Sequence, residues 1–191
     1  MKLVAILNRM ENTKEMDINY LNAVSDNGAI PVLINENNLE LIKFCGGILL
    51  TGGDEKGSLD DYLIKYALDN NLPLLGICQG MQSMALYNTN NKLVNVSNHY
   101  KCEHIINIED SKLKNIIGKS EIIVNSYHHQ QVLSSKEFKV TARSCDGVIE
   151  ALESSNDIFQ IGVEWHPEKM NSEDSKKIFR EFIGQIKTTI I

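Results

Sequence analysis

A cysteine between two glycines marks the part of the sequence where covalent chemistry is most readily placed. Cys78 follows the apolar run 72–77 and stands in the pattern Gly76-Ile77-Cys78-Gln79-Gly80. Flanking glycines permit a sharp strand-to-helix turn that pushes the central side chain out of the sheet. At a helix N-terminus the backbone dipoles lower the pKa of a thiol, which makes it more nucleophilic. Taken alone, the pattern fits a nucleophile and a small core cysteine about equally well.

A histidine and a glutamate near the C-terminus could supply the base that such a cysteine needs. His166 and Glu168 stand two residues apart in the segment Gly162-Val163-Glu164-Trp165-His166-Pro167-Glu168. In an extended segment, residues two apart project to the same side. Glu168 could then fix the tautomer of His166 and leave the other ring nitrogen free to take the proton of Cys78. A solvated surface pair is the commoner interpretation of such a motif, but an elbow cysteine favours the catalytic one.

Thr51-Gly52-Gly53 follows the apolar run 47–50 and could supply the third part of an active site. In an open parallel sheet, sites form at the carboxyl ends of the strands. The backbone N–H of Gly53 could therefore face a developing oxyanion, with the N–H of Gln79 as the second donor. By itself, a pair of glycines also fits an ordinary turn.

Apolar and amphipathic segments alternate through the first half of the chain, and they must position these residues. Such an order predicts an α/β fold with a doubly wound, three-layer, mostly parallel sheet. Residues 72–77 carry almost no polar side chain, as expected for a strand covered on both faces. The expected strands are residues 2–7, 30–34, 47–50 and 72–77, and the expected helices are 14–27, 59–70 after a cap at Ser58, and 79–87.

The second half is richer in short strands joined by polar turns such as Cys145-Asp146-Gly147. We expect these strands to be antiparallel additions to the parallel core. No linker, repeat or low-complexity segment interrupts the sequence, so residues 1–191 are predicted to form a single domain. The expected strands are residues 102–108, 121–125, 139–143, 148–153 and 159–163, and the expected helix is 172–186.

Composition and charge narrow the class of protein and its partners. The 191 residues are 42% hydrophobic and 23% charged, which excludes a disordered chain. Lys and Arg number 19 against 25 Asp and Glu, a net charge of −6 that argues against a nucleic-acid or membrane partner. No stretch approaches the roughly 18 apolar residues of a membrane span. The four cysteines form no CxxC pair, so we expect a reduced, cytoplasmic setting.

Taken together, these segments resemble the class I glutamine amidotransferase-like superfamily, and within it the γ-glutamyl hydrolase branch, peptidase family C26. The same branch includes γ-glutamyl-γ-aminobutyrate hydrolase-like proteins. The resemblance implies a flavodoxin-like core in a single glutamine amidotransferase type 1-like domain. It is specific because several motifs match in the expected order. They are the glycine turn 47–54, the cysteine segment 74–82, Asn-Ser-Tyr-His-His-Gln at 125–130, Asp-Gly-Val-Ile-Glu-Ala at 146–151, and 162–168.

The resemblance implies roles for individual residues. Cys78 would be the nucleophile, His166 the general base and acid, and Glu168 the residue that orients His166. Gly53 and Gln79 would supply the oxyanion-hole N–H groups. The remaining implied residues would bind substrate, and they are Gln82, Ser126, Tyr127, His128, His129 and Gln130.

The implied reaction cleaves a γ-glutamyl amide through a γ-glutamyl thioester and releases glutamate and an amine, with no cofactor. The substrate could be a γ-glutamyl-amine, a γ-glutamyl peptide, or a γ-glutamyl nucleotide amidate such as γ-glutamyl-CDP-amidate. A glutaminase subunit that delivers ammonia to a separate synthetase partner is the alternative. A non-catalytic binding protein on the same fold is the least favoured possibility, because Cys78, His166 and Glu168 are all present.

Two segments depart from the family pattern, and one further motif has to be weighed. The loop 54–58 and the turn 87–92 are shorter or different from those of the family, which suggests an open rim on the amine side of the site. His99, Cys102 and His104 have a spacing that could hold zinc, but a fourth ligand is missing. The sequence therefore predicts no metal site. The adjacent His128 and His129 should point to opposite faces, and Trp165 should be a packing residue.

Overall fold

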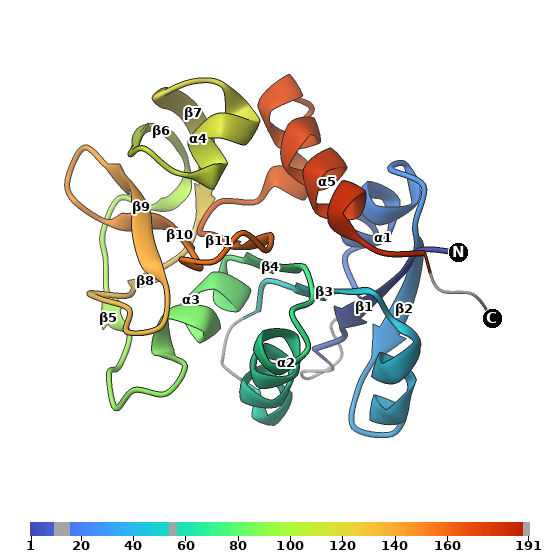
Figure 1. Cartoon of the computed structure of the whole chain (residues 1–191). Helices are drawn as coiled ribbons and strands as arrows, with labels where there is room; N and C mark the ends of the chain where they lie inside the picture. Colours follow the sequence, from blue (N-terminus) through green and yellow to red (C-terminus); the bar gives the residue numbers. More distant parts are fainter. Residues whose placement is uncertain (10–15, 54–56, 189–191) are drawn as a thin grey trace.

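The computed structural model describes residues 1–9, 16–53 and 57–188, and a twisted sheet runs through the middle of the molecule (Figure 1). Within these residues, nine strands pair in the order β2-β1-β3-β4-β11-β10-β9-β6-β7. The first five strands of this order are parallel, and the pairs from β11 to β7 are antiparallel. The strands are β1 Leu3–Leu7, β2 Ile30–Ile34, β3 Gly47–Leu50, β4 Leu74–Ile77, β6 Tyr100–Ile108, β7 Glu121–Tyr127, β9 Lys139–Ser144, β10 Ile149–Glu153 and β11 Gln160–Val163.

Helices cover both faces of the sheet, because alternate residues of the central strands point to opposite sides. Ile6, Leu49 and Leu75 pack on the face covered by α1, α4 and α5. Leu50 and Leu74 pack on the opposite face, beneath α2 and α3. The helices are α1 Ile18–Ser25, α2 Ser58–Asp69, α3 Gln79–Leu86, α4 Lys112–Ile117 and α5 Glu173–Gln185, with 3-10 turns η1 Leu39–Phe44 and η2 Pro167–Lys169. The predicted doubly wound α/β fold with added antiparallel strands is confirmed.

Some element boundaries differ from the prediction for local reasons. Helix α2 begins at Ser58 itself, and the carboxylate of Asp60 accepts the N–H of Gly57 at 2.8 Å. The N-cap residue is therefore Gly57, and the predicted Ser58 is the first residue of the helix. The short helix α4, which was not predicted, is capped by Ser111 and ends at Gly118 with φ 81°. Two-residue strands β5 Val94–Asn95 and β8 Gln130–Gln131 form a small separate pair.

The first residues of the predicted helix 14–27 and part of the shortened loop 54–58 lie outside the described residues. None of the helices in the described ranges is both long enough and apolar enough to cross a membrane. The cytoplasmic setting stays a prediction.

Candidate active site

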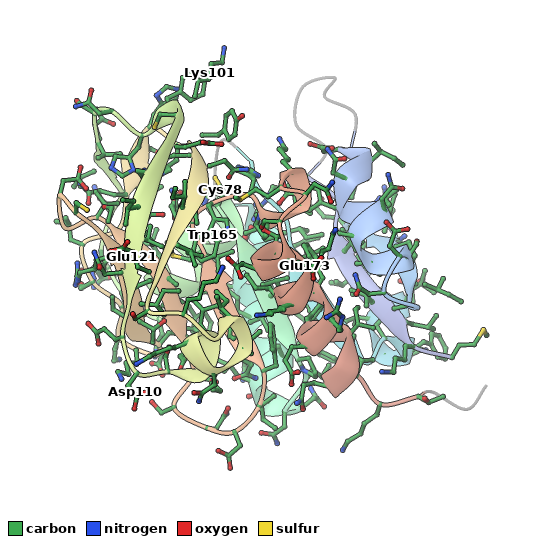
Figure 2. The ribbon with its side chains drawn as sticks, turned by 90° about the horizontal axis from the view of Figure 1, so that it is seen from above. Cys78, Lys101, Asp110, Glu121, Trp165 and Glu173 are labelled. Atoms are coloured by element: carbon green, nitrogen blue, oxygen red, sulfur yellow. The ribbon has the colours of Figure 1, made fainter. Side chains whose placement is uncertain are left out.

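Three neighbouring parallel strands deliver the predicted catalytic segments to one edge of the sheet. Strand β4 lies between β3 and β11, with Leu50 paired to Gly76 and Val163 paired to Ile77. The segments that follow these strands therefore leave the sheet side by side. They carry the Thr51–Gly53 turn, Cys78 and the Glu164–Glu168 stretch. In Figure 2, Cys78 and Trp165 lie in the middle of the molecule, and Trp165 is buried as predicted.

Cys78 occupies a strained turn between β4 and α3. Its φ of 51° and ψ of −110° lie outside the regions that most residues adopt. The turn is held by Cys78 N–H, which donates to Val163 O at 2.8 Å, and by Gln82 N–H, which donates to Cys78 O at 3.0 Å. Gly80 must be small, because an added Cβ there would lie 2.3 Å from the carbonyl oxygen of Leu50. The predicted strand-to-helix elbow is therefore present.

Cys78 is only 6% exposed, and the electrostatic surroundings of its thiol differ from the expectation. Burial, together with the carboxylate of Glu164, raises the pKa of Cys78 well above its ordinary value. The backbone N–H of Gln79 acts in the opposite direction, as the helix N-terminus should, but it is outweighed. The expectation of a lowered pKa was wrong, because desolvation of the thiolate and a nearby buried acid dominate over one N–H.

His166 is held from two sides. Its Nδ1 lies 2.7 Å from Oε1 of Glu168. Asn125 on β7 clamps the main chain, since its side-chain oxygen accepts His166 N–H at 2.8 Å and its amide donates to His166 O at 3.0 Å. The ring of Tyr127 stands edge-on to the imidazole at 5.8 Å between centroids. These contacts fix the position and orientation of the imidazole.

Gly52 is the point at which the predicted residues meet. An added Cβ at Gly52 would lie 3.0 Å from Cε1 of His166 and 3.6 Å from Cβ of Cys78. The imidazole and the cysteine thus both lie against the same small glycine. The Tyr20 hydroxyl accepts Gly52 N–H at 2.9 Å and lies beside the carboxylate of Glu168. The burial of Tyr20 raises the pKa of its hydroxyl, and the charge of Glu168 raises it further.

The turn that carries Gly53 is braced by a buried ion pair. The Arg9 side chain packs on Gly53, where an added Cβ would lie 2.5 Å from Cδ of Arg9. Arg9 Nε donates to the carbonyl oxygen of Thr51 at 3.1 Å, and Nη1 donates to Asp60 at 2.8 Å. Gly53 N–H has no acceptor within the residues that the structure describes, whereas Gly52 N–H is bound to Tyr20.

The predicted substrate-binding residues divide into an inward and an outward set. Gln82 is buried, and its amide donates to Oε1 of Glu164 at 2.5 Å and to Gln130 O at 3.3 Å. Ser126 and His128 are also buried, and Ser126 Oγ donates to His99 O at 2.7 Å. Tyr127 and His129 are exposed. The adjacent histidines thus point to opposite faces, and roles in substrate binding stay predictions.

Several residues around the site were missed by sequence reasoning. Asn125 stands at the start of the Asn-Ser-Tyr-His-His-Gln motif, which was the available signal for it. Tyr20, Arg9 and Asp60 reach the site from α1, the end of β1 and α2, and no local motif marks them. Of the three residues whose spacing could hold zinc, Cys102 directs its Sγ at Asn98 O, at 3.2 Å. His99 instead lies with His128 and Glu150.

Several relatives share this sequence pattern over different parts of their length. A protein of Schizosaccharomyces pombe assigned as a glutamine amidotransferase is 35% identical over 141 residues, which cover 65% of this chain. The matched part spans about half, 55%, of the length of that relative. The γ-glutamyl-γ-aminobutyrate hydrolase of Escherichia coli O157:H7 is 29% identical over 95% of this chain and 91% of its own. A glutamine-hydrolysing GMP synthase subunit of Haloquadratum walsbyi is 33% identical over 76% of this chain and 78% of its own.

A solved structure and a family model also match this chain. A crystal structure of a protein assigned as a GMP synthase subunit, from Thermoplasma acidophilum, superposes with a TM-score of 0.76 at 23% identity. It covers 96% of this chain and 93% of its own, and it shows the fold. The peptidase C26 family model matches residues 54–168, which include the cysteine elbow, the His-His motif and the His166–Glu168 pair. The chain belongs to the peptidase C26 family.

Proposed function

We propose that this protein is a cysteine-dependent hydrolase that cleaves a γ-glutamyl amide bond and releases glutamate and an amine. The observation that carries the proposal is the convergence of Cys78 and His166 on Gly52, with Glu168 2.7 Å behind the imidazole. A nucleophile, a base and a residue that orients the base are the three parts that acyl transfer needs. The similarity to γ-glutamyl-γ-aminobutyrate hydrolase supports a γ-glutamyl acyl group.

The proposed first half-reaction forms a thioester. Glu168 keeps the proton of His166 on Nδ1, so that Nε2 can take the proton of Cys78 as the sulfur attacks the γ-carbonyl carbon. Backbone N–H groups of Gly53 and Gln79 hold the oxyanion, each contributing about 2.7–4 kcal/mol to transition-state stabilisation. The C–N bond then breaks, and the proton on Nε2 leaves with the amine.

The second half-reaction regenerates the enzyme. His166 takes a proton from water, which attacks the thioester carbonyl, and glutamate leaves as the thiol recovers its proton from Nε2. The raised pKa of Cys78 supports a neutral resting thiol, so the proton transfer to His166 belongs to the attack itself. The attack creates a positive charge on the buried imidazole of His166 and a negative charge on the oxyanion. Glu168 faces the developing imidazolium and so lowers the cost of charging it.

Recognition of the two halves of the substrate is proposed to divide between buried and exposed groups. Gln82 and the buried residues of the 126–130 segment would recognise the γ-glutamyl end. For this, the amide of Gln82 either leaves Glu164 and binds the substrate, or it keeps this contact and acts on the substrate through Glu164. Tyr127 and His129, which are exposed, would border the amine. The amine could belong to a γ-glutamyl-amine, a γ-glutamyl peptide or a γ-glutamyl nucleotide amidate. In this proposal residues 1–191 act as one domain.

A glutaminase subunit that passes ammonia to a synthetase is the second candidate. The 33% identity to the Haloquadratum walsbyi GMP synthase subunit, over three quarters of both chains, supports it. The two candidates share the same thioester chemistry and differ in the acyl donor and in the need for a partner protein.

One assay separates the candidates. The purified chain is incubated with L-glutamine and with γ-glutamyl-amine, γ-glutamyl-peptide and γ-glutamyl-nucleotide conjugates, and glutamate release is measured. A Cys78→Ala variant tests the nucleophile, and Cys145→Ser is the matched control, since Cys145 is exposed and lies in a turn. Cys78-dependent release from a conjugate supports the hydrolase. Activity on glutamine that appears only when a synthetase is added supports the glutaminase. Activity of Cys78→Ala equal to that of the unaltered chain contradicts both candidates.

A further inference from the structure

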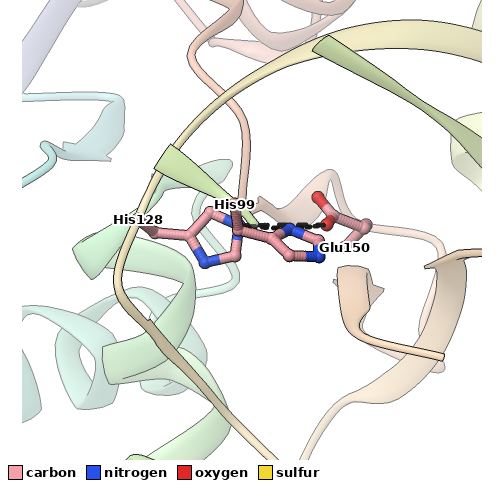
Figure 3. A group of neighbouring side chains, drawn as sticks. All are labelled: His99, His128 and Glu150. Carbon is pink, nitrogen blue, oxygen red and sulfur yellow. Dashed lines mark hydrogen bonds and ion pairs between the residues drawn. The ribbon is translucent and has the colours of Figure 1, made fainter. Parts of the chain in front are cut away.

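Three buried side chains outside the proposed catalytic trio present ligand atoms to one another. His99 immediately precedes β6, His128 follows β7 and Glu150 lies on β10 (Figure 3). One ligand atom from each lies within 4.8 Å of the others. His99 Nδ1 lies 3.1 Å from His128 Nε2 and 3.5 Å from Glu150 Oε1, and His128 Nε2 lies 3.9 Å from the same oxygen. We call these three residues the His-His-Glu cluster.

The outward-facing ring nitrogens are already committed as donors. His99 Nε2 lies 3.1 Å from the carboxylate of Asp146, and His128 Nδ1 lies 2.8 Å from Gln130 O. Both partners are acceptors, so both of these nitrogens carry protons. In the neutral rings, His99 Nδ1 and His128 Nε2 therefore bear lone pairs, and these point into the cluster.

The atoms of the three cluster residues that face one another are therefore all acceptors. Glu150 Oε1 also lies 3.0 Å from Nε2 of His104, which offsets the carboxylate charge when that nitrogen carries a proton. Both oxygens of Glu150, a fully buried residue, have no hydrogen-bond partner within the described residues. A buried carboxylate facing two lone pairs is costly unless a positive charge lies among them. That charge is a proton on His99, His128 or His104, or it is a bound metal cation.

The geometry favours the metal. Separations of 3.1–3.9 Å bracket the roughly 3.3 Å between ligands of a tetrahedral zinc ion with Zn–N distances near 2.0–2.1 Å. A ligating histidine usually donates its other N–H to a carboxylate or a carbonyl oxygen, as His99 and His128 both do. Imidazole ligands suit zinc and its first-row neighbours rather than magnesium or calcium.

We propose that His99, His128 and Glu150 bind a divalent transition-metal ion, with zinc the best match. His104 is placed to complete the site, because its Nε2 lies 3.0 Å from Glu150 Oε1 and has no hydrogen bond within the described residues. Cys102, which the sequence offered as a ligand, takes no part. The role is structural. The ion ties the start of β6 and the end of β7 to β10, and so steadies the 126–130 segment. This proposal goes beyond the hydrolase function and does not depend on it.

Metal binding can be measured without any enzyme assay. The full chain is stripped with EDTA, dialysed and titrated with Zn²⁺ in competition with a chromophoric chelator. The expected result is one ion per chain with a dissociation constant below about 1 µM, and a higher Tm for the zinc-loaded chain. Loading with Co²⁺ should give the visible absorption of a four-coordinate ion without a sulfur charge-transfer band.

Variants locate the site. Glu150→Gln should weaken binding by at least about 100-fold, and Asp146→Asn by about 10–100-fold through loss of the carboxylate charge beside Nε2 of His99. Asp146 is half exposed, so this second variant should fold even where Glu150→Gln does not. Cys102→Ser is the matched control and should bind zinc as the unaltered chain does. The proposal is overturned by a stripped chain that binds no zinc at this affinity. It is also overturned by binding that survives Asp146→Asn in full, or by a cobalt spectrum with a sulfur band.

Discussion

His166 Nδ1 lies 2.7 Å from Oε1 of Glu168, while Asn125 binds both the N–H and the carbonyl oxygen of the same histidine. The ring and its main chain are therefore fixed independently. With Nδ1 as donor to Glu168, Nε2 is the nitrogen left for proton transfer. The Glu168 side chain is fully buried, so its charge acts on His166 with little screening by water.

Replacing Glu168 by glutamine should lower kcat by about 100- to 10,000-fold while the fold is retained. The amide keeps the size of the side chain but loses the charge that stabilises the imidazolium, and its NH₂ group can favour the wrong tautomer. Glutamate release under saturating substrate measures the effect. Glu173→Gln, an exposed carboxylate at the start of α5, is the control and should leave kcat unchanged. A Glu168→Gln enzyme with undiminished kcat would remove Glu168 from the mechanism.

The pH dependence of Cys78 alkylation follows from its raised pKa. A raised pKa keeps the thiol protonated to higher pH than an ordinary cysteine, whose pKa is about 8.5. The rate of modification by iodoacetamide, followed on the Cys78 peptide by mass spectrometry, should therefore still be rising above about pH 9. Glu164→Gln should move the midpoint to lower pH, because the Glu164 carboxylate contributes to the shift. A rate that levels off below about pH 7 would instead indicate that the helix N-terminus dominates.

The same shift has a consequence for stability. Because the thiol is more acidic in the unfolded chain, its contribution to folding is complete below the unfolded pKa and declines as pH rises toward the folded pKa. The Tm of the unaltered chain should therefore fall relative to that of Cys78→Ala as pH rises above about 8.5. Parallel Tm curves for the two proteins from pH 7 to 10 would contradict the raised pKa.

The central sheet and the positions of the catalytic candidates could be predicted from the sequence, because both rest on local patterns. The unbroken apolar run before Cys78 and the flanking glycines specify a buried strand and a tight turn, whichever residues surround them. The braces of the site could not be predicted in this way. Arg9 and Asp60 are about fifty residues apart, and only the pairing of β1 with β3 and the packing of α2 bring them together.

The pKa of Cys78 also could be predicted only in part, because only one of its causes is local in the sequence. The helix N-terminus can be read from the sequence around the cysteine, and its effect has the predicted sign. Glu164 directly follows the neighbouring strand β11, eighty-six residues further along the chain. Its effect on the thiol, and the extent of burial, depend on tertiary packing, which a pattern around one residue does not contain.

The ion pair between Arg9 and Asp60 should be important for both stability and activity. Their side chains are only 6% and 0% exposed, so Asp60→Asn removes a buried negative charge that faces the Arg9 guanidinium. Breaking such a pair typically costs about 3–5 kcal/mol of the free energy of unfolding. The change also loosens the Thr51–Gly53 turn, so kcat should fall at least about tenfold. Urea unfolding and glutamate release measure the two effects. The exposed pair Lys65–Asp69 provides the control, and Asp69→Asn should leave both quantities unchanged.

Two glycine-to-alanine changes should have opposite effects on stability. At Gly80 a methyl group would lie 2.3 Å from the carbonyl oxygen of Leu50, which is main chain in a central strand and cannot move aside. Gly80→Ala should therefore displace the elbow, lower Tm markedly and abolish Cys78-dependent activity. At Gly184, in the last turn of α5, an added Cβ has no neighbour within 4 Å. Gly184→Ala should raise the free energy of unfolding by about 0.4–1 kcal/mol, because it restricts the unfolded chain without a clash. Equal Tm changes for the two variants would contradict the close approach of α3 to β3 on which the elbow depends.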